Sequence, residues 1–352
     1  MKHRFRFSAP SRRRLQGFDA QLDQETIKRE QEASELFHSE EEVTSQPLEQ
    51  AAAAPAPEDA EENVTEREDA AQSSAADVSP AAAEGDAAPR TKYIGAIDSA
   101  GFSVAYRSDV GKVRANNQDA FILASPLYGV ADGMGGHQGG ETASAMCRDE
   151  MIRLMLQEKD EETEDEGERL CKAVRITNRR IFMKSLDEAG LNGMGTTLTA
   201  LLAGEDRVWI AHVGDSRCYL YRDGTLTQVT NDHSMVMEMV RSGYITVEQA
   251  LTHPMRNVIT RAVGTERSVQ VDLIEKERKQ GDIWLLCSDG LTGPVKDDTI
   301  QELLEVIQDE QSELGLEEIA ESFLQLTLSR GAPDNVTFVI LVDREASHGA
   351  CS

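Results

Sequence analysis

Short apolar runs bordered by aspartate are the feature that most constrains how this chain can fold. Asp132 and Asp289 each follow such a run, and Asp334 lies just before another. Aspartates at the ends of strands can converge at one edge of a sheet although they are far apart in the sequence. Three carboxylates aimed at one point repel each other unless a cation lies between them. Because Mg²⁺ and Mn²⁺ prefer carboxylate oxygens, the pattern predicts a metal-dependent hydrolase.

Period-two alternation and short apolar runs bounded by glycine and aspartate predict a strand-rich domain. Strands are expected at 103–107, 120–124, 127–131, 197–203, 207–213, 218–222, 269–274, 282–287 and 336–342. An Asp-Gly pair at Asp223 predicts a hairpin that leads into 226–229. Helices are expected at 141–159, 168–189, 297–309 and 316–329. The first of these carries one apolar stripe at helical spacing, made of Ala143, Met146, Cys147, Met151 and Leu154.

The first 91 residues differ in composition from the rest. Residues 1–14 hold six Lys or Arg and no acid, whereas residues 15–90 hold 20 acidic and four basic residues and are rich in Ala and Pro. Such a segment buries too little apolar surface to offset its ordering entropy. We therefore expect a disordered tail over 1–91, one folded domain over 92–345 and a short C-terminal tail over 346–352. The N-terminal tail is either a solvated tether or an arm that binds a partner.

Charge and cysteine content limit the partners and the cellular compartment that we expect for the protein. The 63 acidic and 36 basic residues give a formal charge of -27, which argues against binding to nucleic acid. The five cysteines show neither paired nor zinc-type spacing, as is typical of reduced thiols in the cytoplasm. No apolar stretch approaches the ~20 residues of a membrane helix, and the basic start lacks the apolar core of a secretory signal. A cytoplasmic protein without a membrane span is expected.

Eight short motifs in a fixed order make the interpretation specific. They are Val113–Asp119, Asp132–Gly136, Gly195–Thr197, Val213–Arg217, Asn231–Ser234, Thr260–Gly264, Ser288–Gly290 and Asp334–Thr337. Each motif is weak alone, but in this order they resemble the metal-dependent (type 2C, PPM) serine/threonine protein phosphatases in their bacterial form. The resemblance runs from about Lys92 to Asp343.

This resemblance implies a fold and an activity. The fold is α+β, an α-β-β-α sandwich of two antiparallel sheets flanked by helix pairs. The activity is hydrolysis of phosphoserine and phosphothreonine on proteins, with two Mn²⁺ or Mg²⁺ ions and a third, weaker metal site. Phosphorylated protein substrates, an opposing serine/threonine kinase and a monomeric state follow from it. A flap beside the active site is expected around 234–257, where helix signals and methionines occur. Those methionines suit either an adaptable contact surface or packing against the sandwich.

The resemblance also assigns roles residue by residue. Asp132 bridges the two metals, and the Gly133 carbonyl binds one of them. Asp289 and Asp334 complete the first metal site, and Asp119 holds a metal-bound water. The further roles are the third metal for Asp215, phosphate binding for Arg114, and ordering of the site's floor for Thr196 and Thr197.

Several positions depart from the family pattern or leave a choice open. Gln118 stands where many relatives carry glutamate, which puts the affinity of the second metal site in question. Met134 stands where eukaryotic relatives carry a histidine, so the general acid is unassigned and His137 is only a candidate. His233 is expected to order the loop into the flap, and His212 to be a core residue. The alternative function is a catalytically weak scaffold that binds phosphoproteins; loss of metal aspartates would favour it, and none is lost.

Overall fold

The computed structural model describes residues 92–99, 101–157, 165–309, 312 and 314–344. The tails predicted over 1–91 and 346–352 lie outside the described residues, so the domain boundaries stay predictions. In the described part, no helix is both long and apolar enough to cross a membrane.

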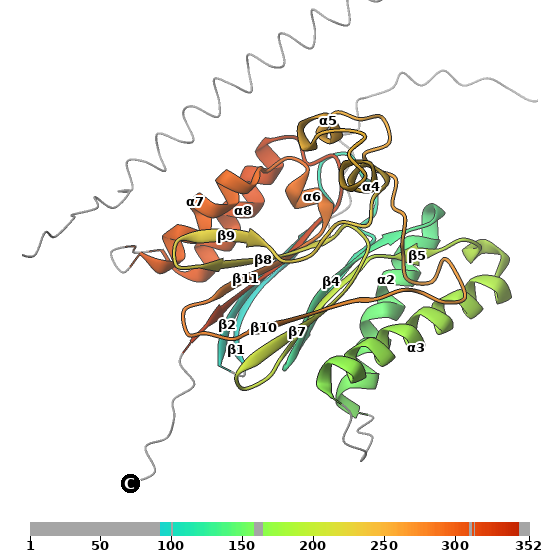
Figure 1. Cartoon of the computed structure of the whole chain (residues 1–352), viewed down its shortest axis with the longest axis horizontal. Helices are drawn as coiled ribbons and strands as arrows, with labels where there is room; N and C mark the ends of the chain where they lie inside the picture. Colours follow the sequence, from blue (N-terminus) through green and yellow to red (C-terminus); the bar gives the residue numbers. More distant parts are fainter. Residues whose placement is uncertain (1–91, 100, 158–164, 310–311, 313, 345–352) are drawn as a thin grey trace, which may run out of the picture. The chain divides into compact units, whose positions relative to one another are not determined.

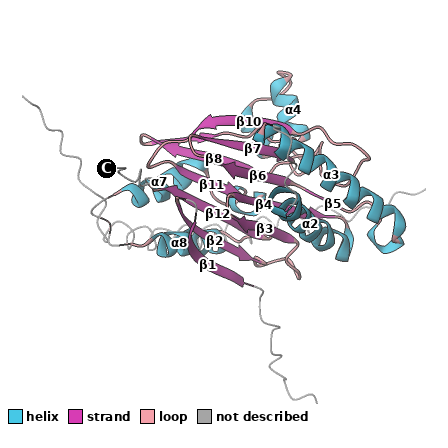
Figure 2. Ribbon diagram, turned by 90° about the horizontal axis from the view of Figure 1, so that it is seen from below, coloured by secondary structure: helices cyan, strands magenta, loops and turns pink. Residues whose placement is uncertain are grey.

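Two antiparallel sheets form the centre of the domain (Figures 1 and 2). One sheet has the order β1-β2-β12-β11-β8-β9, and the other has the order β10-β7-β6-β4-β3, with β5 paired to β4. The strands are β1 (Lys92–Ser99), β2 (Phe102–Asp109), β3 (Asp119–Ala124), β4 (Leu127–Met134), β5 (Gly195–Thr196), β6 (Leu198–Ala203), β7 (Arg207–Val213), β8 (Arg217–Arg222), β9 (Thr225–Gln228), β10 (Asp272–Glu277), β11 (Ile283–Cys287) and β12 (Val336–Asp343).

Helices cover the outer faces of both sheets. The helices are α2 (Gly136–Ile152), the π-helical turn η1 (Arg153–Gln157), α3 (Glu166–Asp187), the 3₁₀ turn η2 (Ala189–Leu191), α4 (Met235–Arg241), α5 (Val247–Leu251), α6 (Asp289–Thr292), α7 (Asp297–Gln308) and α8 (Leu316–Ser329). In Figure 1, α2 and α3 lie beside the sheet that contains β4 and β7, and α7 and α8 lie beside the other sheet. The predicted α-β-β-α sandwich is confirmed.

Strand β4 shows how the sequence pattern builds the layers. Successive side chains of a strand point to opposite faces. Tyr128 and Val130 lie in the core between the two sheets, whereas Leu127 and Ala131 lie in the core under α2 and α3. All four are buried. The alternation therefore places β4 at the centre of the domain, with both faces covered.

The apolar stripe predicted on α2 faces the sheet. Ala143, Cys147 and Met151 are fully buried in the core that also contains Ala131. The helix starts earlier than expected, at Gly136, directly after β4, and it passes into a π-helical turn at Arg153. The helix that follows, α3, begins where Asp165 accepts hydrogen bonds from the N–H groups of its first turn.

Three strands differ from the sequence expectation, and one of them is the short β5, which precedes the expected strand at 197–203. The strand β1 was not predicted; it is an edge strand that pairs along its whole length with β2. The strand expected at 269–274 instead runs over 272–277. Val269 and Val271 pack against the helix-side core rather than extending the pairing with β7, so their apolar character reflects packing and not strand position.

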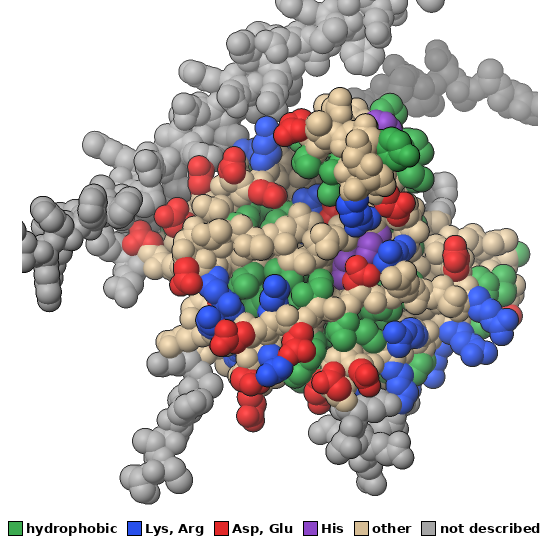
Figure 3. Space-filling view, in the orientation of Figure 1, with side chains coloured by type: hydrophobic (Ala, Val, Ile, Leu, Met, Phe, Trp, Pro, Cys, Tyr) green, Lys and Arg blue, Asp and Glu red, His purple; other side chains and the backbone are tan. Residues whose placement is uncertain are grey.

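The segment predicted to form a flap contains α4 and α5. Ser234 caps α4, and Thr246 caps α5 through a capping box with Gln249. Val236 and Ala250 are buried, so the segment does pack on itself or the domain. Four large apolar side chains remain exposed on it, Tyr244, Val247, Leu251 and Met255. Figure 3 shows hydrophobic side chains at the top of the view, over α4 and α5.

Candidate functional site at the ends of both sheets

The register of β3 and β4 brings the first two predicted aspartates together. Asp119 lies directly opposite Asp132 in the antiparallel pair, so their side chains project from the same face of the sheet. Asp132 is held through its backbone: its N–H donates to Thr197 Oγ1 at 2.9 Å, and its carbonyl accepts from Thr196 Oγ1 at 2.9 Å. These contacts agree with the floor role expected for the two threonines.

The second sheet supplies two more aspartates at the same place. Asp289 begins α6 just after β11 ends, and Asp334 lies just before β12, the antiparallel neighbour of β11. The carboxyl group of Asp289 lies close enough to that of Asp132 for the two charges to repel each other, so the two sheets meet at this point. Gly290 allows the close approach, because a Cβ there would lie 1.9 Å from the Asn335 carbonyl oxygen.

Burial and mutual repulsion raise the pKa values of these carboxyl groups. Burial, together with the charges of Asp289 and Asp334, raises the pKa of Asp119 to about 7. Burial, followed by the charge of Asp119, raises the pKa of Asp132 well above its usual range. Burial and the charge of Asp334 likewise raise the pKa of Asp289. A site that holds several desolvated carboxyl groups favours whatever positive charge enters it.

Asp215 joins this group from the turn between β7 and β8. Burial and the charge of Asp289 raise its pKa to about 7. Three of the carboxyl groups have a buried oxygen, Oδ1, without a hydrogen-bond partner; they belong to Asp119, Asp215 and Asp289. Orphaned buried acceptors of this kind are rare in folded proteins. They fit the oxygen donors that a divalent cation needs.

The carboxyl groups lie near each other, but their oxygens do not all point to one common position. Among the described residues, no three Asp, Glu, His or Cys side chains are already arranged as a finished metal site. One reason is that Asp334 turns toward Arg114, whose Nη2 donates to Asp334 Oδ2 at 2.7 Å. The unpartnered buried oxygens and the raised pKa values nevertheless mark a place where positive charge is favoured. The residues present fit a divalent cation.

Arg114 lies in the exposed loop that precedes β3, and its side chain is 52% exposed. A guanidinium at the rim of a carboxylate cluster can present paired donors to a phosphoryl group. Its contact with Asp334 places it at the cluster. The assignment of Arg114 as phosphate ligand stays a prediction.

Sequence reasoning gave no role to two residues that organise the cluster. Ser288 Oγ donates to Asp119 Oδ2 at 3.0 Å. The Asn335 side chain accepts from the N–H of Gln118 at 2.9 Å and donates to the carbonyls of Val110 and Asn116. Their only sequence signal is that each is adjacent to a predicted ligand. Gln118 itself packs against α2, since a Cβ at Gly140 would lie 2.9 Å from Gln118 Cδ.

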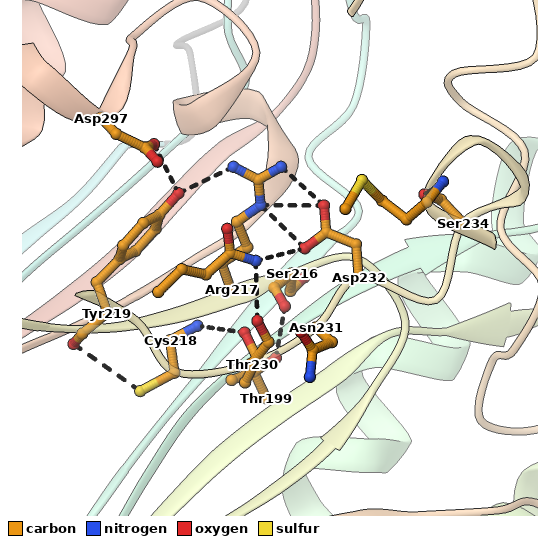
Figure 4. A network of polar contacts seen from close by, with 12 residues as sticks. Thr199, Ser216, Arg217, Cys218, Tyr219, Thr230, Asn231, Asp232, Ser234 and Asp297 are labelled. Atoms are coloured by element: carbon orange, nitrogen blue, oxygen red, sulfur yellow. Dashed lines mark hydrogen bonds and ion pairs between the residues drawn. The ribbon is translucent and has the colours of Figure 1, made fainter. Parts of the chain in front are cut away.

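A buried ionic network supports the turn that carries Asp215. Arg217 donates from Nη2 to Asp232 Oδ2 at 2.7 Å and from Nη1 to Tyr219 Oη at 2.9 Å. Tyr219 in turn donates to Asp297 at the start of α7. Figure 4 shows the Arg217 guanidinium between Tyr219 and Asp232. The network links β8 to the loop that enters α4.

The histidines fall into different classes. His212 is fully buried, contacts Thr199 Oγ1 at 2.9 Å and the Asn231 carbonyl at 3.0 Å, and has its pKa lowered to about 4 by burial and by His233. It is the satisfied core residue that was expected. The side chain of His137 lies outside what the structure describes. His233 joins the turn of Asp215 to the loop into α4, as its contacts with Gly214 show.

Comparison with known proteins identifies the family. The model of the family "Protein phosphatase 2C" matches residues 112–325. The serine/threonine protein phosphatase PstP of Mycobacterium tuberculosis is 44% identical over 236 residues, which are 67% of this chain and 44% of that protein. The serine/threonine phosphatase stp of Listeria monocytogenes is 39% identical over 250 residues, 68% of this chain and 95% of that protein. The chain belongs to the protein phosphatase 2C family, which confirms the resemblance.

A solved structure agrees with the fold. The crystal structure of the catalytic domain of PstP in complex with two manganese ions superposes with a TM-score of 0.59 at 41% identity, and the match covers 69% of this chain and 99% of that one. The chain spans less than half the length of PstP itself.

Proposed function

We propose that this protein hydrolyses phosphoserine and phosphothreonine on other proteins, with Mn²⁺ or Mg²⁺ as cofactor. The observation that carries the proposal is the cluster of Asp119, Asp132 and Asp289, contributed by both sheets, in which Asp119 and Asp289 each have a buried oxygen without a hydrogen-bond partner. Membership in the family and the manganese-bound relative support the same reaction.

The site residues have distinct parts in this proposal. Asp132 would bridge two cations, with Gly133, Asp289 and Asp334 as further ligands, Asp119 holding bound water and Asp215 serving a third, weaker site. When bound, the cations supply a water molecule of lowered pKa and positive charge next to the phosphoryl oxygens.

The chain's own residues position the aspartates and bind the phosphoryl group. Thr196 and Thr197 hold the backbone of Asp132, and Ser288 orients Asp119 through its hydroxyl. Arg114 binds the phosphoryl oxygens with paired donors. Gly133 lets β4 approach the backbone of α2 closely, and Gly290 lets α6 approach the backbone before β12 closely.

The cellular setting is also part of the proposal. We place the protein in the cytoplasm as a monomer that acts in signal transduction, opposite a serine/threonine kinase, on phosphorylated protein substrates. Four cysteines in the described part are free and buried, which suits a reducing compartment. The enzymatic domain is taken as 92–345, and the segment before it as an arm for a partner.

Metal dependence tests the proposal directly. Activity of the full chain on p-nitrophenyl phosphate should appear with added Mn²⁺ or Mg²⁺ and disappear with excess chelator. Adding back Mn²⁺ should restore it, which separates metal loss from unfolding. A phosphoserine peptide should be hydrolysed under the same conditions. Full activity in excess chelator would refute the metal mechanism, and binding of the peptide without turnover would favour a phosphoprotein-binding scaffold.

A further inference from the structure

His233 makes a set of contacts that the proposed reaction does not account for. It is almost completely buried, at 1% exposure, between the sheet that contains β7 and the loop into α4. Its Nδ1 lies 3.0 Å from the backbone nitrogen of Gly214, and its own backbone N–H donates to the Gly214 carbonyl at 2.8 Å. One residue thus satisfies both polar backbone groups of Gly214.

Gly214 is the residue just before Asp215, and its conformation leaves little freedom. Its φ is +112°, and a Cβ would lie 2.6 Å from Thr197 Cγ2. Only glycine suits this position. A glycine has more backbone freedom than other residues, so the two hydrogen bonds between Gly214 and His233, one in each direction, restrict the direction in which Asp215 leaves β7.

The tautomer of His233 follows from its partners. The Gly214 N–H can only donate, so Nδ1 must be the acceptor and Nε2 must carry the proton. That proton points to Asp272 Oδ2 at 3.1 Å. Arg261 Nη1 donates to the other oxygen of Asp272 at 3.0 Å; it also lies 3.3 Å from His233 Nε2, a contact that is not a hydrogen bond while Nε2 carries the proton. Burial lowers the pKa of His233, which keeps the ring neutral near pH 7. The ring therefore has one fixed acceptor and one fixed donor.

Backbone hydrogen bonds of His233 also connect the turn at Gly214 to the α4–α5 segment, residues 235–251. Ser234, the next residue, caps α4 and forms a bridge with Ile259. The carbonyl of His233 accepts from Thr260 N at 2.8 Å, so both ends of the segment meet at this residue. Asp232, on the other side, is held by Arg217 (Figure 4).

We propose that His233 is a positioning residue, whose imidazole holds Asp215 in the carboxylate cluster and fixes it relative to the α4–α5 segment. The proposal rests on the proposed function, in which Asp215 is a cation ligand. The ring touches neither Asp215 nor any cation site; it acts through the Gly214 backbone.

Two substitutions separate this role from simple packing. His233→Asn places an amide oxygen near the position of Nδ1 and can still accept from Gly214. His233→Gln reaches the position of Nε2 instead, so it can keep the contact with Asp272 but leaves the Gly214 N–H without an acceptor. Asp272→Asn serves as the control for the outer contact, because it leaves the ring and Gly214 in place.

The first measurement needs no metal. Hydrogen exchange of peptides that contain Gly214, in chelator, should be about tenfold faster in His233→Gln, because a buried N–H has lost its partner. It should stay near the wild-type rate in His233→Asn and in Asp272→Asn. An unchanged rate in His233→Gln, or equal acceleration in both His233 variants, would overturn the proposal.

The second measurement is calorimetric titration with Mn²⁺. The part of the isotherm that depends on Asp215 is defined as the part lost in Asp215→Ala. His233→Gln should weaken that part several-fold and spare the rest, whereas His233→Asn should retain it. Wild-type Mn²⁺ binding in His233→Gln would contradict the proposal. Wild-type protein that binds Mn²⁺ in this way but hydrolyses no phosphoester would refute the proposed function alone.

Discussion

At the residue scale, the site combines buried carboxyl groups that repel each other with a positive side chain that attracts them. Asp119 and Asp132 are direct cross-strand neighbours, and the charge of Asp289, which follows β11 of the other sheet, acts on Asp132. The guanidinium of Arg114 contacts this group at Asp334. Substitutions of the carboxyl groups and of Arg114 should therefore have different signatures, the former in metal binding and stability and the latter in substrate binding.

Arg114→Ala should raise the KM for p-nitrophenyl phosphate by about tenfold with a smaller change in kcat, because it removes phosphate binding more than metal activation. Arg114→Lys should recover only part of the loss, since an ammonium lacks the paired donors. Arg148→Ala is the matched control: Arg148 is another exposed arginine paired with an aspartate, on α2. Steady-state kinetics at saturating Mn²⁺ would decide, and an unchanged KM in Arg114→Ala would exclude the phosphate role.

The raised pKa values predict how stability depends on pH. Asp119 and Asp215 titrate at about 7 in the folded chain, against about 3.9 when unfolded. The folded state therefore holds more protons between these values, and its stability falls as pH rises from about 4 through 7. Each such group contributes at most about 1.4 kcal/mol per pH unit.

Urea unfolding in chelator at pH 5, 6, 7 and 8 measures this slope. Asp215→Asn should flatten it, because one titrating group is gone. Saturating Mn²⁺ should also flatten it, since the cation takes the place of the protons. A free energy of unfolding that rises from pH 5 to 7 in chelator would show that these carboxyl groups are not the dominant titrating set.

At the element scale, the close approach of α6 and β12 is what lets Asp289 and Asp334 share a site. Gly290→Ala would press a methyl group onto the Asn335 carbonyl, 1.9 Å away. We expect a loss of about 1–3 kcal/mol in stability, as for other overpacked sites, together with loss of turnover. Gly190→Ala is the control, because a Cβ there meets nothing within 4 Å. Thermal unfolding and activity on p-nitrophenyl phosphate check both, and an active, stable Gly290→Ala protein would show that the two elements can move apart.

The sequence predicted this architecture well wherever local pattern decides the structure. Helices α7 and α8 begin where expected, and β7 matches its predicted range, because apolar periodicity and turn residues are local signals. The edge strand β1 was missed, since an edge strand is defined by its partner β2 and not by its own pattern.

In the site, the aspartates were found from their positions at strand ends and from the family motifs. The roles of Ser288 and Asn335 could not be derived in this way, and for His233 only the role in the loop into α4 was predicted, not the contact with Gly214. Each depends on a contact with a residue far along the chain, such as Gln118 for Asn335 or Gly214 for His233. Single-sequence periodicity carries no information about such pairs.

At the scale of the whole molecule, all the predicted site residues lie after residue 91. Removal of 1–91 should therefore leave kcat and KM for p-nitrophenyl phosphate nearly unchanged. Any electrostatic effect of the tail should shrink with salt, because exposed charges are screened within about 10 Å at 0.1 M ionic strength. Full-length and truncated protein compared across a salt series provide the measurement. A large, salt-independent fall in turnover would place part of the removed segment in the enzymatic fold.

The contribution of both sheets to one site has a consequence for the order of events during synthesis. Asp119 and Asp132 leave the ribosome early, but the strands β11 and β12 that carry their partners follow about 150 to 200 residues later. In the proposed mechanism, a nascent chain has its full set of cation ligands only after Asp334 has emerged and the two sheets have docked. Metal loading would then follow docking of the sheets, and a chain that ends before Asp334 would not hydrolyse phosphoproteins.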